Sequence, residues 1–307
     1  MYDIITFGSA VVDVFVETDL PEKGKFMYYP VGSKILMKSI RFAVGGGGTN
    51  TAVAFSRLGF KTGYIGKIGN DIEGKEIIQR LKDEGVEFLG KVEKGATSGY
   101  SVILDSRDHD RTVLAYKGVN DDLKYNEIPA GKINTKWMYC SSMMGTSFET
   151  QKKLIKILTN KGVKVAFNPS EYLIKNHNIL PILKMTEVLA VNKEEAEMIL
   201  EKYKIRNKDL LEGLRSLGPR IVVVTDKNRP IRAYDGNRKF FLKPHNKIKV
   251  VERTGAGDAL ASGFVAGLMT GWDIDRALKL GLRESESVIS HVGAKDKLLR
   301  MNLKKGR

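Results

Sequence analysis

The chain has 307 residues, 42% of them hydrophobic, and this length favours one large domain with a smaller appendage. Its formal net charge is +15, but the basic residues are spread among acidic ones and only the tail 304–307 is purely basic, so we expect no nucleic-acid partner. No run approaches the roughly 18 to 20 apolar residues of a membrane-spanning helix, and the first residues lack a secretory-signal pattern, so we expect a cytoplasmic protein without a membrane partner.

Short β-branched or aromatic runs alternate with longer amphipathic runs along most of the chain. The strand candidates are residues 4–7, 62–65, 137–140, 163–167, 188–191 and 221–224. Residues 72–84 and 194–203 place apolar side chains at helical spacings between such strands. This alternation predicts βαβ units and a mostly parallel sheet.

Two stretches depart from that alternation and are predicted to be antiparallel strands. One is residues 11–17; the other is residues 98–104 paired with 112–116 across the polar turn 105–110. These strands predict a small sheet separate from the main one. Because we find no internal repeat or Pro-rich linker, any second unit should be built from insertions.

The glycine run at residues 45–50, GGGGTN, precedes the helix-like residues 51–59. Glycine allows left-handed backbone and close approach of other groups, and a helix start offers unpaired amides. A flexible turn is the structural alternative, but Asn50 at the helix entrance brings both a donor and an acceptor and favours a ligand cradle. Neither the P-loop pattern nor the dinucleotide pattern fits this run.

The single cysteine, Cys140, follows Trp137, Met138 and Tyr139. It has no cysteine partner for a disulfide or a thiolate metal site. Its apolar neighbours favour a buried core thiol over a nucleophile.

A second glycine segment, RTGAGDALASGF, spans residues 253–264. It predicts a helix start whose amides and dipole form an anion hole. Asp258 falls in the first helical turn, where the structural alternative is a capping carboxylate. Gly263 and Gly267 each cost roughly 1 kcal/mol relative to Ala inside a helix, so close packing or ligand approach must require them. A carboxylate beside an anion hole can deprotonate a hydroxyl while the amides hold a phosphoryl group.

Together the two segments resemble the signatures of the ribokinase (PfkB carbohydrate kinase) family: Gly-Gly-x-Gly-x-Asn at 45–50 and a Thr-x-Gly-Ala-Gly-Asp-like element at 253–258. The likeness covers essentially the whole chain, 1–307, as a single ribokinase-like domain. It implies an α/β fold, a three-layer α/β/α core with a mostly parallel central sheet, and a small β-sheet lid formed by insertions at about 11–40 and 97–118.

The resemblance implies a kinase that transfers a phosphoryl group from ATP, with Mg2+, to a hydroxyl of a sugar, nucleoside or related polyol. It implies that Asp258 is the general base and that Gly255, Ala256 and Gly257 form the anion hole. The expected substrate contacts are Asp13, Gly46, Gly47 and Asn50, with Arg111 available to an anionic substrate. A homodimer through the lid is compatible with this expectation.

For the nucleotide, the family's Asn-x-x-Glu element corresponds to Asn192 and Glu195, with Glu195 organising magnesium through water. The same pair fits a helix-capping pattern, and both roles can hold together. The other expected nucleotide contacts are Thr225, Lys227, Gly257 and His291.

Three departures from the family pattern keep alternatives open. Glu252 stands where many members have Asp, which argues against monovalent-cation activation. In the loop 225–230, Lys227 and Pro230 replace two glycines, which leaves a catalytically idle sugar- or nucleotide-binding sensor as the alternative function. The charged residues at 281–287 leave ADP as an alternative donor.

Overall fold

A computed structural model describes residues 1–19, 22–23, 26–105, 111–207, 209–245, 248, 250–291 and 293–304. The strands of its main sheet are β1 (Tyr2–Phe7), β6 (Thr62–Ile65), β8 (Glu87–Phe88), β12 (Thr135–Ser141), β13 (Lys164–Asn168), β14 (Val188–Asn192), β15 (Ile221–Thr225), β16 (Ile231–Tyr234) and β17 (Lys239–Leu242). Their order is β17-β16-β15-β14-β13-β12-β1-β6-β8. All neighbours from β15 to β8 are parallel, and β16 and β17 extend the sheet antiparallel. The predicted strands are confirmed to within two residues at each end.

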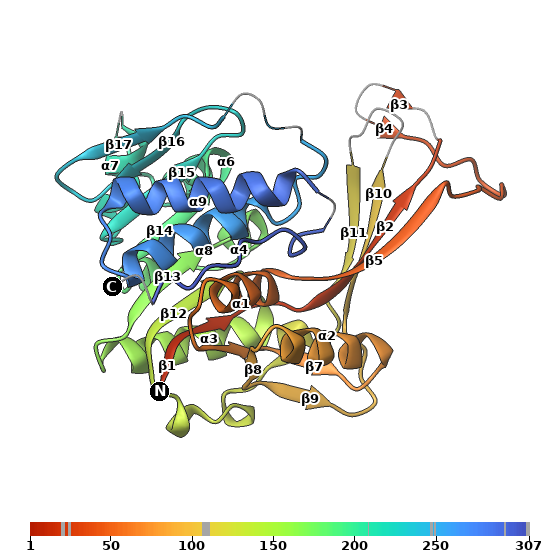
Figure 1. The fold of residues 1–307 in the computed structure, drawn as a ribbon, viewed down its shortest axis with the longest axis horizontal. Coiled ribbons are helices and arrows are strands. Elements are labelled where there is room, and N and C mark those ends of the chain that lie inside the picture. Colours follow the sequence, from red (N-terminus) through yellow and green to blue (C-terminus); the bar gives the residue numbers. More distant parts are fainter. Residues whose placement is uncertain are drawn as a thin grey trace.

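Helices cover both faces of this sheet (Figure 1). One face packs against α3 (Gly145–Thr159), α4 (Glu171–Asn176), α5 (Leu180–Leu183), α6 (Lys193–Lys202) and α7 (Leu210–Ser216). The other packs against α1 (Gly47–Arg57), α8 (Ala256–Met269) and α9 (Ile274–Ile289). Successive strand residues alternate between the two cores: Met138 joins the first and Tyr139 the second. The predicted three-layer α/β/α fold is therefore confirmed.

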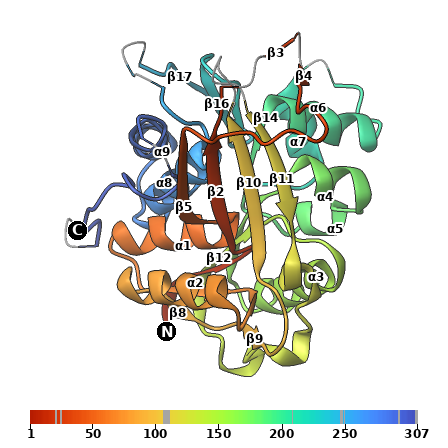
Figure 2. The same ribbon diagram turned by 90° about the vertical axis from the view of Figure 1, so that its right-hand side faces the viewer.

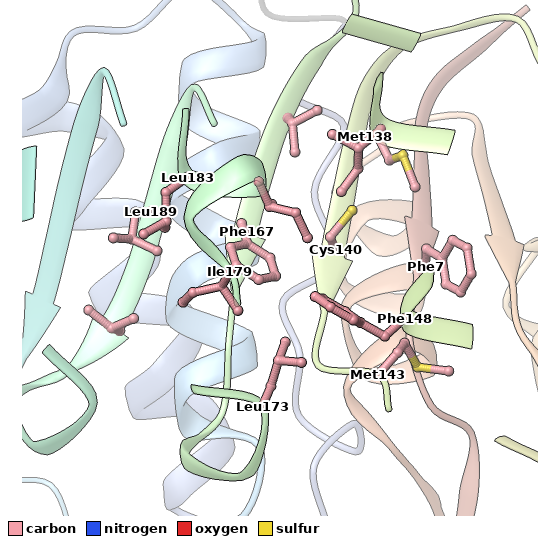
Figure 3. Close-up of a cluster of buried hydrophobic side chains, with 14 of the residues drawn as sticks. Phe7, Met138, Cys140, Met143, Phe148, Phe167, Leu173, Ile179, Leu183 and Leu189 are labelled. Atoms are coloured by element: carbon pink, nitrogen blue, oxygen red, sulfur yellow. The ribbon is translucent and has the colours of Figure 1, made fainter. Parts of the chain in front are cut away.

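Cys140 lies in the first of these cores. It is fully buried, and Figure 3 shows it among apolar side chains that include Phe7, Met138 and Phe167. Burial raises the pKa of its thiol. The prediction of a core thiol is confirmed.

A smaller sheet extends from the main body and faces the viewer in Figure 2. Its strands β2 (Val11–Glu17), β5 (Ser39–Gly45), β10 (Gly99–Asp105) and β11 (Arg111–Tyr116) have the order β11-β10-β2-β5. The β10–β11 pair is antiparallel as expected, and β2 pairs antiparallel with β5, a strand that was not predicted. The β2–β10 pair is parallel, which corrects the all-antiparallel expectation. Both strands start at the body, Val11 opposite Gly99, and run outward together. Residues 106–110 of the predicted hairpin turn lie outside the described residues.

The remaining elements are short, apart from α2 (Ile72–Asp83), which packs beneath the small sheet. They are β3 (Glu22–Lys23), β4 (Phe26–Met27), β7 (Lys67–Gly69), β9 (Lys91–Glu93) and the 3-10 helices η1 (Gly118–Asp122), η2 (Tyr125–Glu127) and η3 (Ala130–Lys132). Within the described ranges, no helix is long and apolar enough to cross a membrane.

Helices α8 and α9 lie side by side at backbone contact (Figure 1). A Cβ added to Gly263 would lie 2.9 Å from the Cα of Gly281, and one added to Gly267 would lie 2.8 Å from the Cα of Ala277. Close packing is therefore the reason for both interior glycines, the first of the two explanations that the sequence offered.

Candidate active site

Most of the predicted site residues lie near the carboxyl edge of the parallel strands. β12, β14 and β15 end there at Ser141, Asn192 and Thr225. Ligands of open α/β sheets bind outside this edge. Two helix starts, those of α1 and α8, also meet there.

The first helix start is wrapped tightly against the turn that follows β1. Gly46 precedes α1 with a φ of 93°, a conformation that favours glycine. The amide of Gly48 donates to the carbonyl of Ser9 at 3.1 Å, and a Cβ on Gly48 would lie 2.6 Å from the carbonyl carbon of Gly8. Gly48 of the glycine run is therefore required for close backbone packing, whether or not other residues of the run contact a ligand.

The second helix start leaves one glycine open. Gly255 precedes α8 in the left-handed region, with a φ of 80°, and a Cβ there would lie 2.4 Å from the Cβ of Ala294. A Cβ on Gly257 would have no heavy atom within 4 Å. The amide of Ala256 donates to the carbonyl of Arg253 at 3.2 Å, so the three amides of the predicted anion hole do not all point outward in this conformation.

Glu252 is engaged by its own loop. Its Oε1 accepts hydrogen bonds from the backbone amides of Arg253 and Thr254, at 2.7 and 2.8 Å, and from the Thr254 hydroxyl at 2.9 Å. The carboxylate that departs from the family pattern thus stabilises the turn that leads into α8.

Asn50 joins the two helix starts. Its Nδ2 donates to Oδ2 of Asp258 at 2.9 Å across 208 residues of sequence. Its Oδ1 accepts a hydrogen bond from Nζ of Lys295, a residue to which the sequence analysis assigned no role. Burial raises the pKa of Asp258, while the Asn50 hydrogen bond and the Lys295 charge act in the opposite direction.

Asp13 lies on the face of the small sheet that looks toward Lys295. It is 6% exposed, and Ser101, opposite it on β10, is buried on the same face. A Cβ on Gly45 would overlap the Asp13 carboxylate, so the start of the glycine run makes room for this side chain. Arg111 pairs with Asp105 in the register of β11, and its side chain lies outside the described residues.

Asn192 and Glu195 form a reciprocal capping box at the start of α6. The Asn192 amide donates to Oε2 of Glu195 at 2.9 Å, and the Glu195 amide donates to Oδ1 of Asn192 at 2.8 Å. Burial raises the pKa of Glu195 to about 7, with smaller contributions from neighbouring carboxylates that include Asp258. The capping role is therefore present, and the carboxylate is electrostatically coupled to the proposed base.

A cavity of about 470 Å³ opens beside Gly257. Its walls come from the loop after β15, from the facing sides of α8 and α9, and from Pro244, His245, Ile248 and Val250. Thr225, Lys227 and Gly257 line it as predicted for nucleotide contacts, but Asn192 and His291 do not. Its size falls within the range of small-molecule sites.

Lys227 has a backbone conformation that favours glycine. Its φ is 49°, in the left-handed region that a side chain adopts only at some cost. Its exposed ammonium lies 3.9 Å from Oε1 of Glu194.

His291 is exposed beyond the end of α9, where its Nδ1 lies 2.9 Å from the hydroxyl of Ser290. His245 lines the cavity instead, with its Nδ1 2.8 Å from Oε2 of Glu286. No motif marks His245 in the sequence, because it stands in an irregular segment.

Comparison with known proteins is consistent with this geometry. The family model described as pfkB family carbohydrate kinase matches residues 1–300. An uncharacterized sugar kinase of Archaeoglobus fulgidus is 30% identical over 257 residues, covering 81% of this chain and 99% of the relative. A cytidine kinase of Thermococcus kodakarensis is 28% identical over 301 residues, covering 95% and 98%. The crystal structure of a ribokinase from Thermotoga maritima has a TM-score of 0.84 at 19% identity, covering 100% of this chain and 99% of that one.

The family match spans nearly the whole chain, and the relatives that share its length are kinases by name. Both glycine segments and the Asp258 carboxylate lie at one edge of the sheet, joined through Asn50. The chain therefore belongs to the pfkB family of carbohydrate kinases and is a phosphotransferase that acts on a sugar or nucleoside.

Proposed function

We propose that the protein transfers the γ-phosphoryl group of ATP to a hydroxyl of a sugar, nucleoside or related polyol. The acceptor binds between the Asp13 face of the small sheet and Asp258, and the nucleotide binds in the cavity beside Gly257. The observation that carries this proposal is the hydrogen bond from Asn50 to Asp258, because it fixes a carboxylate next to an open helix start.

Asp258 acts as the general base. The Asn50 amide donates a hydrogen bond to Oδ2 of Asp258. The other carboxylate oxygen, Oδ1, faces the backbone of Gly47, where a Cβ added to Gly47 would lie 3.5 Å away. The acceptor hydroxyl donates its proton to this carboxylate as its oxygen attacks the γ-phosphorus, and the bond from that phosphorus to the bridging oxygen breaks so that ADP leaves. The amides and dipole at the start of α8 stabilise the negative charge of the transferring group. Asp13 and the backbone of Gly46 and Gly47 orient the acceptor.

Mg2+ is the cofactor that we propose, with Glu195 as its carboxylate contact through water. No cluster of three or more His, Cys, Asp or Glu side chains among the described residues could hold a metal ion. Magnesium is commonly held by one or two carboxylates together with nucleotide phosphates, and a single Glu195 fits that pattern. When bound, the ion neutralises charge on the phosphates.

The small sheet acts as a lid that excludes water from the acceptor, which limits hydrolysis of the nucleotide. Its outer face is apolar: Phe42 and Leu114 lie in the same cross-strand row and are 58% and 56% exposed. We propose that a homodimer covers this face. The single buried cysteine suits the cytoplasmic location that we also propose.

A coupled assay of nucleotide turnover, run with sugars, polyols and nucleosides and with ATP or ADP as donor, tests the proposal. One acceptor should give turnover that needs Mg2+, and Asp258→Asn should lower its kcat by about 10² to 10⁴ because the base is lost. Isothermal titration should still detect acceptor binding to Asp258→Asn. Near-normal turnover of this variant would exclude the mechanism, and binding without turnover in the unaltered protein would favour the sensor.

A further inference from the structure

Lys295 is buried beside the site although its neighbours in sequence, Asp296 and Lys297, are charged. Only 3% of its surface is exposed. The residue before it, Ala294, packs against Gly255, and Nη1 of Arg57 in α1 donates to the backbone carbonyl of Lys295. Burying an ammonium group is costly unless its donors are satisfied. The backbone around Lys295 is therefore held between the start of α8 and the end of α1.

The partners of Lys295 are uncharged oxygens. Its Nζ donates to the carbonyl of Val44 and to Oδ1 of Asn50. An ammonium group has donors and no acceptor, so the amide oxygen of Asn50 must face Lys295. The amide nitrogen then faces the opposite way, where it donates to Oδ2 of Asp258 at 2.9 Å.

Carboxylates surround this ammonium group. Asp13 and Asp258 are the strongest negative influences on it, and Asp296 adds a weaker one, while Arg80 opposes them. Burial lowers the pKa of Lys295 to about 7, and the carboxylates act against that shift. Its positive charge therefore lies between the proposed substrate-binding and catalytic carboxylates.

We propose that Lys295 is a positioning residue for phosphoryl transfer, which turns the Asn50 amide toward Asp258 and keeps Asp13 and Asp258 ionised together. This inference rests on the proposed function, because it takes Asp258 as the base. Loss of the cation removes an influence that lowers the pKa of Asp258, and loss of the donor releases the Asn50 amide. Both effects lower the fraction of enzyme molecules in which Asp258 is ionised and oriented to accept a proton.

The test compares Lys295→Met, which removes charge and donor, with Lys295→Gln, which removes the charge and keeps a donor. Lys67→Met is the matched control: Lys67 is 5% exposed but pairs with Glu93 at 2.9 Å and Glu127 at 3.0 Å, and it has no contact with the Asn50 network. kcat/KM is measured from pH 5 to 9 with the acceptor found in the substrate screen.

Lys295→Met should lower kcat/KM at pH 7 by roughly tenfold or more and move the acidic limb of its pH profile upward by about one pH unit. Lys295→Gln should show the same movement with a smaller loss of kcat. Lys67→Met should keep the wild-type limb while losing thermal stability. If the acidic limb of the pH profile does not move in Lys295→Met while the Asp258→Asn variant is inactive, this inference alone is overturned. If the Asp258→Asn variant is active, the proposed function is overturned instead.

If Lys295→Met does not fold, the coupling is measured in a protein that retains the lysine. In NMR titrations of ¹³C-labelled lysine, Asp258→Asn should lower the pKa of Lys295 relative to wild type, because the carboxylate that favours its charged form is gone. An unchanged pKa would contradict the proposal.

Discussion

The two helix starts at the site use the same residue type for different purposes. Gly46 before α1 and Gly255 before α8 both have positive φ, 93° and 80°, and neither makes a side-chain cap hydrogen bond. At α1 the protein's own backbone occupies the space that glycine leaves, since Gly8 contacts Gly48. At α8 the space beside Gly257 stays open toward the cavity. Glycine thus permits internal packing at one start and ligand access at the other.

Asn50→Leu breaks the link between the two starts and should have the largest effect. Asp258 loses its donor and Lys295 loses an acceptor, so kcat should fall by about 10² or more and the protein should lose about 2 to 4 kcal/mol of stability from an unpaired buried charge. Steady-state kinetics and urea unfolding measure the two losses. An unchanged kcat would show that the helix starts act independently.

Gly48→Ala tests the packed start. The added methyl would overlap Gly8, so we expect about 1 to 3 kcal/mol of destabilisation from overpacking. Urea unfolding gives this value, and kcat per folded molecule should change less than in Asn50→Leu. Full stability in this variant would mean that the backbone contact relaxes without cost.

Gly257→Ala tests the open start. A methyl group there meets no protein atom, and Ala favours a helix by about 0.5 to 1 kcal/mol over Gly, so stability should hold or rise. The KM for ATP should rise about tenfold, because the methyl enters the space proposed for the phosphates. A normal KM would place the nucleotide elsewhere.

Gly131→Ala is the control with the smallest effect. Gly131 also has open space around its Cβ position, but it belongs to η3 and does not line the cavity. Kinetics should match wild type, and stability should change by less than about 0.5 kcal/mol. If Gly131→Ala raised the KM for ATP as much as Gly257→Ala, the effect of Gly257→Ala could not be assigned to its position beside the cavity.

Those parts of the fold that depend on local sequence patterns could be predicted from the sequence. Alternating apolar runs located the strands, and the glycine motifs located both helix starts, because turn geometry and helix polarity are local properties. The parallel pairing of β2 with β10 was missed, since strand direction within the small sheet depends on where each strand leaves the body. The hydrogen bond between Asn50 and Asp258 was not predicted, since it joins residues 208 positions apart that only the fold brings together.

Lys295 shows why the rest could not be predicted. In the sequence it belongs to Lys-Asp-Lys at 295–297, a pattern typical of an exposed surface. Its burial arises only when Val44 and Asn50, separated from it by 251 and 245 residues, come together in the fold. The same limit applies to His245 and His291, because neither their position in a helix nor a motif indicated which of them lines the cavity.

The backbone contact between α8 and α9 has a mechanical consequence for the catalytic cycle. Gly263 and Gly267 hold α8 and α9 in backbone contact, and both helices contribute walls to the proposed nucleotide cavity. We therefore expect these two helices to move as one unit. The opening that admits substrate and releases product should then come from the acceptor side, where β2 and β10 leave the body at Val11 and Gly99.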